Sequence, residues 1–155
     1  MFGNRSQISP FQYLYGYIPH EISQINPFFC RVEEYIKELW NSYKSKDFIL
    51  SDIYSKRIYR KNLTDMNANK LFNYILQASE TEFGMQSLVR VNEYLDSNKK
   101  QTKAILYTYD SVLFDCHKDD KRDTLIELKR LMSNNQFPIK CYIGRNYNEM
   151  IIADI

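Results

Sequence analysis

The 155-residue sequence predicts an α+β fold, in which an antiparallel sheet carries helices on one face and follows a mostly helical region. Three observations lead to this prediction. Two long segments repeat apolar residues at helical spacing. The apolar run 104–116 is too long for one ordinary strand and is broken by polar residues. Glycine and proline are scarce, at four each, which favours long regular elements.

Composition indicates a folded cytoplasmic protein. Aromatic residues reach 15% and charged residues 26%, which argues against disorder. No apolar run approaches the ~18 residues of a membrane span, and the N-terminus lacks the order of a signal peptide. The three cysteines, Cys30, Cys116 and Cys141, are widely spaced, which is typical of a reduced chain and not of a disulfide framework or zinc site. A net charge of +2 neither demands nor excludes nucleic acid.

The first third of the chain predicts two helices and a hairpin. Ser9-Pro10 is a helix start signal, and the short aromatic helix that it opens should close at Gly16. Asn26-Pro27 repeats the signal, and apolar residues at helical spacing then predict an amphipathic helix over 27–45. Residues 48–59 suit two short strands or a hairpin.

The segment 55–61 is the most basic stretch of the sequence. It interleaves lysine and arginine with tyrosine, a pattern that can grip a phosphate backbone. An edge strand kept soluble by its charges would show the same pattern. The sequence leaves both interpretations open.

Residues 66–98 form the longest periodic segment and predict a long helix. Its apolar stripe is formed by Leu71, Ile75, Ala78, Met85, Leu88, Val91 and Leu95. A second face carries Asn69, Asn73, Gln77 and Thr81 at steps of four. Amides both donate and accept, which suits base edges or sugars, although a polar helix face is most often simply solvated.

The second half predicts a hairpin, a helix and a last strand. The polar break at 109–111 divides the run 104–116 into a buried hairpin with a tight turn. A charged amphipathic helix should cover 119–134, with Leu125, Leu128 and Leu131 facing inward. A further strand over 138–143 should end at Gly144.

Asp110 lies in that break, flanked by apolar residues on both sides. Burial of a carboxylate is costly unless it is paired, bound to a metal or placed at a turn. One interpretation is a common turn aspartate. The other is a rigid oxygen ligand for Mg²⁺ at the tip of a hairpin, as two-metal phosphoryl transfer requires.

Five segments in order resemble the C-terminal part of a family A (DNA polymerase I-like) DNA polymerase, especially the phage-type versions. The match covers roughly residues 7–150. One segment resembles the end of the fingers helix, the next a basic strand, the third an Asn-x3-Gln element of the palm helix, the fourth the catalytic hairpin, and the fifth the last strand. They are Phe11–Gly16, Lys56–Tyr59, Asn73–Gln77, Tyr107–Ser111 and Phe137–Gly144.

The resemblance implies a DNA-directed DNA polymerase, a nucleotidyltransferase of a bacterial or phage-infected cell. It implies a fingers remnant over 1–63 and a palm-like antiparallel sheet with its helices over 64–155. Asp110 would bind the catalytic Mg²⁺ ions. Phe11 and Tyr15 would contact the incoming deoxynucleoside triphosphate and the template base. Arg57, Asn73 and Gln77 would contact primer–template DNA.

The sequence departs from the family pattern at several positions. The second metal-binding carboxylate would precede residue 1, and Gln7 stands where the family has the triphosphate-binding lysine. Pro10 interrupts a helix that is continuous in the family, and Tyr109 and Ser111 replace the usual histidine and glutamate.

We therefore expect the chain to be inactive alone. It would be a truncation, one half of a split polymerase whose N-terminal remainder is a separate chain, or a degenerate paralogue. Two alternatives remain at this point: a non-catalytic nucleic-acid-binding module, and a generic α+β protein-interaction domain.

Overall fold

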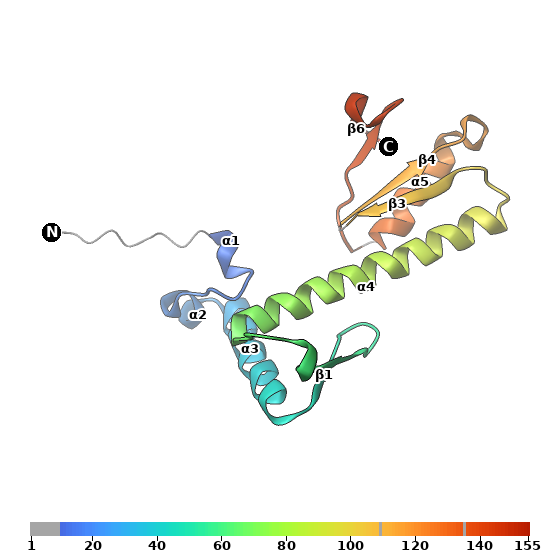
Figure 1. The fold of residues 1–155 in the computed structure, drawn as a ribbon. Coiled ribbons are helices and arrows are strands. Elements are labelled where there is room, and N and C mark those ends of the chain that lie inside the picture. The colour runs from blue at the N-terminus through green and yellow to red at the C-terminus, as the bar shows by residue number, and fades with distance from the viewer. Residues whose placement is uncertain (1–9, 109, 135) are drawn as a thin grey trace. The chain divides into compact units, whose positions relative to one another are not determined.

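The computed structural model has a mixed α+β fold and describes residues 10–108, 110–134 and 136–155 (Figure 1). The chain forms two compact units, one ending at Ser79 and the other beginning at Glu80. One long helix, α4 (Ala68–Ser97), runs from the first unit into the second. The predicted boundary between 63 and 64 falls before this helix, whereas the two units divide within it.

The first unit consists of three helices, a hairpin and the start of α4. Its elements are α1 (Pro10–Tyr13), α2 (His20–Ile25), α3 (Pro27–Ser45), β1 (Phe48–Leu50), β2 (Arg57–Tyr59) and the 3₁₀ turn η1 (Arg60–Asn62). The helix predicted over 27–45 is confirmed to the residue. Its start is fixed because the side chain of Asn26 accepts a hydrogen bond from the backbone N–H of Phe28 at 3.0 Å, with proline in the first turn.

The core of the first unit joins α3, the hairpin and the beginning of α4. Tyr43, Ile49, Leu71 and Ile75 are its buried members, and Leu71 is fully enclosed. β1 and β2 pair antiparallel, with Phe48 opposite Tyr59. The predicted hairpin over 48–59 is therefore confirmed, and it is attached to the core through Ile49.

Gly16 lies where the chain passes close to both α3 and α4. Its φ is +80°, a conformation that other residues seldom adopt. A Cβ on Gly16 would lie 2.8 Å from Cδ1 of Ile36 and 3.3 Å from Cδ1 of Phe72. Glycine is thus required twice over, by the backbone angle and by the lack of space.

The second unit consists of the rest of α4, two hairpins and one further helix. Its elements are β3 (Lys103–Thr108), β4 (Ser111–Asp115), the 3₁₀ turn η2 (Lys118–Asp120), α5 (Lys121–Ser133), β5 (Cys141–Ile143), the 3₁₀ turn η3 (Tyr147–Glu149) and β6 (Ile151–Ala153). The predicted long helix, hairpin, charged helix and last strand are all present. α2 and β6 were not predicted.

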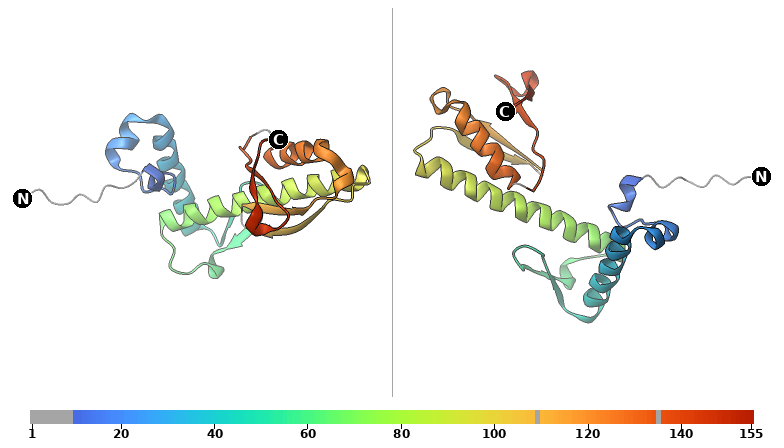
Figure 2. Two further views of the ribbon diagram at one scale, coloured as in Figure 1. Left: turned by 90° about the horizontal axis from the view of Figure 1, so that it is seen from above. Right: turned by 180° about the vertical axis from the view of Figure 1, so that it is seen from behind.

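The core of the second unit is formed by α4, α5 and β4. Val91, Leu95 and Leu128 are buried there, and Phe114 and Leu131 pack against them. Both views of Figure 2 show α5 running alongside the second half of α4. The prediction that the leucine stripe of this helix faces inward is confirmed at Leu128 and Leu131.

Asp120 fastens the start of β3 to the start of α5. Its Oδ2 accepts hydrogen bonds from the backbone N–H groups of Gln101 at 2.9 Å and Thr102 at 2.6 Å. The residue is 8% exposed. A hydrogen bond from the Thr102 side chain, reinforced by the two backbone bonds, holds the pKa of this carboxyl below its ordinary value of 3.8. Asp120 is therefore a buried structural anion.

Two predictions about the sheet need correction. Each hairpin forms its own two-stranded sheet, and in the described residues β5 pairs with β6 instead of joining β3 and β4. The run 104–116 is not a buried strand, because Ile105 is 57% and Leu106 49% exposed. The pairing with β4 shifts register between Ala104 and Leu106, and α4 and α5 cover only part of the hairpin.

No described helix is long and apolar enough to cross a membrane.

Candidate functional site

Asp110 lies in the turn of the β3–β4 hairpin, with its side chain exposed. Thr108 pairs with Ser111, so only positions 109 and 110 separate the two strands. The hydroxyl of Ser111 donates to the backbone oxygen of Thr108 at 3.1 Å, and the two side-chain oxygens lie 3.2 Å apart. The hairpin predicted around 109–111 is present, and Tyr109 lies outside the described residues. The Asp110 side chain is exposed where the Thr108–Ser111 pair closes the hairpin.

Tyr107 connects this hairpin to α4. A Cβ on Gly84 would lie 2.5 Å from the Tyr107 hydroxyl, so the ring lies directly over the helix at its glycine. Burial raises the pKa of the Tyr107 phenol, and the carboxylates of Glu80 and then Asp110 raise it further. The Tyr107 ring therefore lies within electrostatic reach of two carboxylates, one from α4 and one from the turn. Glu80 was not singled out in the sequence, because it is one of many helical glutamates.

Potential metal ligands do not gather into a complete site among the described residues. Among them, no group of three or more His, Cys, Asp or Glu side chains is placed to hold a metal ion. An exposed carboxylate oxygen is the kind of ligand that Mg²⁺ prefers, but one such ligand does not make a site. Asp110 therefore fits the role of one ligand in a larger site.

Asn73 and Gln77 lie one turn apart on α4, on the face that the sequence predicted. Asn73 is partly buried, and its Oδ1 is buried with no hydrogen-bond partner. An unsatisfied buried acceptor of this kind costs about 1–3 kcal/mol. Gln77 is exposed.

The segment that resembles the end of the fingers helix approaches the same part of α4. A Cβ added to Gly16 would lie 3.5 Å from Oδ1 of Asn69. Asn69 lies one turn before Asn73 on α4. Tyr15 precedes this glycine and is partly buried. Phe11 belongs to α1, but its side chain, like Gln7, lies outside the described part of the chain. The first unit thus brings two predicted segments, 11–16 and 73–77, to one end of α4.

Arg57 lies on β2, and its side chain is exposed. Its guanidinium carbon is 4.9 Å from the centroid of the Phe48 ring on β1. The cation is therefore held in place without being neutralised by a carboxylate. Such an arginine can contact phosphate.

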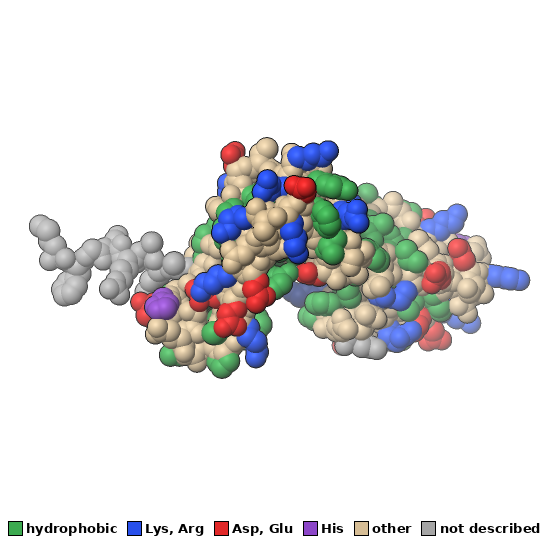
Figure 3. Space-filling view, turned by 90° about the horizontal axis from the view of Figure 1, so that it is seen from below, with side chains coloured by type: hydrophobic (Ala, Val, Ile, Leu, Met, Phe, Trp, Pro, Cys, Tyr) green, Lys and Arg blue, Asp and Glu red, His purple; other side chains and the backbone are tan. Residues whose placement is uncertain are grey.

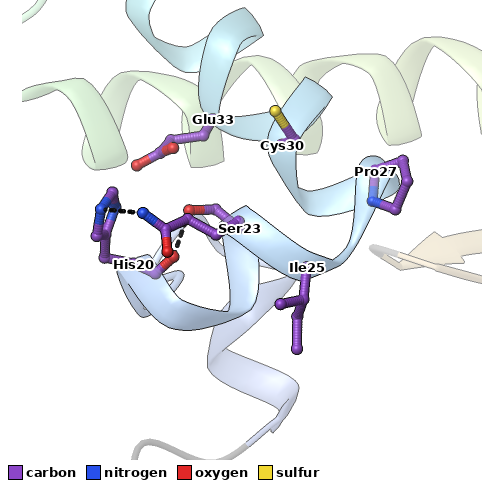
Figure 4. A pocket seen from close by; sticks show the side chains of 7 residues that line it. His20, Ser23, Ile25, Pro27, Cys30 and Glu33 are labelled. Carbon is purple, nitrogen blue, oxygen red and sulfur yellow. Dashed lines mark hydrogen bonds between the residues drawn. The ribbon is translucent and has the colours of Figure 1, made fainter.

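The first unit also has an open hollow of about 370 Å³ between α2 and α3 (Figure 4). The amide nitrogen of Gln24 lies 2.8 Å from Nε2 of His20, and the Ser23 hydroxyl donates to the backbone oxygen of His20 at 3.0 Å. These bonds are local to α2, and no residue predicted to be functional lines the hollow. Its lining residues are His20, Ser23, Gln24, Ile25, Pro27, Cys30 and Glu33.

No protein-family model matches the chain, and a search of curated proteins also finds no match.

Proposed function

We propose that this chain is the C-terminal part of the polymerase domain of a family A-type DNA polymerase, to which it contributes Asp110. The observation that carries the proposal is the open carboxylate on the two-residue turn of a hairpin backed by α4 and α5. Metal-dependent phosphoryl transfer needs an oxygen ligand that is rigid and accessible at once. Asp110 is exposed, and the Thr108–Ser111 pair beside it would restrict its movement.

The order of elements supports the same proposal. The chain begins with a short helix before a Tyr-Gly pair, which a basic hairpin follows. Next come the long helix with Asn73 and Gln77 and the hairpin with Asp110, and then a helix and a last hairpin. This is the order that the resemblance implies. In the complete enzyme the β3–β4 hairpin would belong to a larger, palm-like sheet, and the exposed side chains Ile105 and Leu106 would be covered there.

Asp110 would share its task with residues outside this chain. Bound Mg²⁺ would activate the primer 3′-hydroxyl and stabilise the transferring phosphate of a deoxynucleoside triphosphate. Asp110 would supply one oxygen ligand. The pairing of Thr108 with Ser111 would hold that ligand in place. The N-terminal remainder of the polymerase, covalently joined or a separate chain, would supply the second carboxylate and the triphosphate-binding cation.

The primer–template contacts would come from the first unit. The side-chain amides of Asn73 and Gln77 suit the minor groove, where donors to the shared base acceptors check pair shape without reading base identity. Arg57 suits the phosphate backbone, and Tyr15 the neighbourhood of the template base. This assignment is consistent with a protein that acts on DNA in the cytoplasm.

A non-catalytic nucleic-acid-binding module, or degenerate polymerase paralogue, is the second candidate. The observation that favours it is the single carboxylate at the turn, because two-metal catalysis needs a second one. In that case Arg57 and Asn73 would retain their roles, and Asp110 would be an ordinary turn residue.

Manganese broadening of backbone NMR signals tests the role of Asp110 in the enzyme reconstituted with its N-terminal remainder. Substoichiometric Mn²⁺ should broaden the amide signals of Thr108 and Ser111 when this chain is wild type. Asp110→Asn should abolish this effect, whereas Asp115→Asn, at the exposed far end of β4, should leave it unchanged. Equal broadening in Asp110→Asn would remove Asp110 from the proposed metal site.

Extension assays with the N-terminal remainder separate the two candidates. In the reconstituted enzyme, Asp110→Asn should abolish primer extension while DNA binding is retained. Extension at wild-type rate by the variant would leave only the non-catalytic interpretation.

A further inference from the structure

Basic side chains are concentrated where α3 ends and the first hairpin follows. Segment 44–61 contains six of the 21 Lys and Arg residues of the chain but only two of its 19 Asp and Glu residues. The rest of the chain is left with 15 basic and 17 acidic residues, so the positive charge is local. We call this surface the basic hairpin face; its basic members, all exposed, are Lys44, Lys46, Lys56, Arg57, Arg60 and Lys61.

Aromatic rings, and not carboxylates, hold several of these cations. Besides Arg57 over Phe48, the Nζ of Lys61 lies 5.8 Å from the centroid of the Tyr59 ring. The Nζ of Lys44 lies 5.9 Å from the centroid of the Trp40 ring. An aromatic ring attracts a cation without cancelling its charge. The three ion pairs of the described residues all lie outside segment 44–61, so the charge of the basic hairpin face stays available to a ligand.

Asp52, the acidic residue in the hairpin loop, is hydrogen-bonded to side chains of two helices. The hydroxyl of Tyr35 on α3 lies 3.2 and 3.3 Å from the two carboxylate oxygens of Asp52, to which it donates. The hydroxyl of Ser79 on α4 donates to Asp52 at 3.3 Å. Burial and the Asp52 charge raise the pKa of Tyr35 to about 12, so the phenol remains a donor. The Asp52 carboxylate is thus hydrogen-bonded to side chains of α3 and α4, and it forms none of the ion pairs found in the described residues.

Exposed rings lie among the cations. Tyr54 in the hairpin loop is 51% exposed and Tyr59 on β2 is 41% exposed. Figure 3, which views the molecule from the side of this hairpin, shows Lys and Arg side chains interspersed with hydrophobic ones. Cations that follow a backbone, together with rings that accept bases, are the combination by which proteins bind single strands.

We propose that the basic hairpin face binds an unpaired nucleic-acid strand. The phosphates lie on Arg57, Lys61 and their basic neighbours, and bases stack on Tyr54 and Tyr59. The proposal rests on the phosphate contact proposed above for Arg57 and names its ligand as an unpaired strand, and it does not depend on Asp110 or on nucleotidyl transfer. Tyr59 also serves the hairpin, because it contacts the Phe48 ring edge-on and lies beneath Lys61, and its 41% exposure leaves ring surface for a base.

Fluorescence anisotropy of the full chain with a labelled 20-nucleotide oligo(dT) tests the proposal. Arg57→Ala/Lys61→Ala should weaken binding and reduce the slope of log K against log salt by about 1.4, since each phosphate contact on a single strand contributes about 0.7. Tyr54→Leu/Tyr59→Leu, which keeps the charge, should weaken binding about tenfold or more, because stacking is lost. A 20-base-pair duplex should bind more weakly than the single strand.

Lys118→Ala/Lys140→Ala is the matched control. It removes the same charge from exposed positions of the second unit and should leave the affinity within about twofold. The proposal is overturned if the control weakens binding as much as Arg57→Ala/Lys61→Ala does. It is also overturned if the tyrosine variant binds like the wild type, if the duplex binds as tightly as the single strand, or if anionic vesicles compete as well as oligonucleotide.

Discussion

The hydroxyl of Tyr107 occupies the position that a side chain on Gly84 would need, because a Cβ there would lie only 2.5 Å from it. Gly84 sits inside α4, where glycine ordinarily weakens a helix by about 1 kcal/mol relative to alanine. Because Gly84 has no side chain, Tyr107 of the β3–β4 hairpin can pack directly on the helix backbone. The turn that carries Asp110 is positioned through this contact.

Gly84→Ala should destabilise the second unit in spite of the better helix propensity of alanine. The Tyr107 ring must move, and overpacking of this kind costs about 1–3 kcal/mol. In a Tyr107→Leu background the ring is gone, and the same substitution should stabilise the protein by up to about 1 kcal/mol. Urea unfolding of the four proteins of this cycle measures the change of sign. Stabilisation by Gly84→Ala in the wild type would contradict the contact.

Gly16→Ala should destabilise the first unit by about 2 kcal/mol or more. It forces a positive φ on a residue with a Cβ and brings that Cβ to within 2.8 Å of Cδ1 of Ile36. Ile36→Val removes that methyl group, so the combined variant should recover the steric part of the loss but not the backbone part. Thermal unfolding, monitored by circular dichroism, measures the stability of Gly16→Ala, Ile36→Val and the combined variant. If the losses of the two single variants simply add in the combined one, the steric contribution is contradicted.

Asp120→Asn should destabilise the protein at neutral pH, because two backbone N–H groups lose an anionic acceptor. The lowered pKa makes this stabilisation pH-dependent. It is complete above the ordinary pKa of 3.8 and is lost as the pH falls through the lower pKa of the folded protein.

The gap in unfolding free energy between wild type and Asp120→Asn should therefore stay constant from pH 7 to about pH 5 and narrow below the ordinary pKa. Chemical denaturation across this range measures it. Asp119→Asn, an exposed neighbour, is the control and should show no comparable loss. A gap that widens in acid would show that the carboxylate does not act as an anion.

The isolated chain should incorporate no nucleotide in primer extension with Mg²⁺ or Mn²⁺. Gln7 stands where the resemblance requires the triphosphate-binding lysine, and an amide cannot replace that cation. Among the described residues, no group of three or more ligating side chains is placed to hold a metal ion. Gel-resolved extension of a labelled primer measures the result. Robust extension by the purified chain would refute the view that Asp110 serves a site completed by other residues.

Local signals in the sequence predicted most elements. Asn26-Pro27 defined the start of α3, because the cap and the proline act within one turn. The apolar period predicted α4 and α5, and the polar break at 109–111 predicted the hairpin turn. α2 escaped prediction because six residues are too short to show a period. β6 is as short as β5, but no glycine or proline marks its ends as Pro138 and Gly144 mark those of β5.

Burial and long-range pairing could not be predicted in the same way. Ile105 and Leu106 have the residue types of a buried strand, but whether they are covered depends on what packs against them. In the sequence, Asp120 is one of several acidic residues in a charged run. In the structure it is buried, and it accepts hydrogen bonds from residues 18 and 19 positions away. At the candidate site, the exposure of Asp110 followed from the turn, whereas the contact of Tyr107 with Gly84 depends on tertiary packing.

α4 has a consequence for how the chain can be taken apart. Proteases cut most readily at exposed loop tips. Here the two units meet inside a continuous helix and not at a loop, so the susceptible peptide bonds lie within each unit, at the tips of its hairpins. Limited digestion should therefore nick the units before it separates them, and releasing one from the other requires several helical turns to melt.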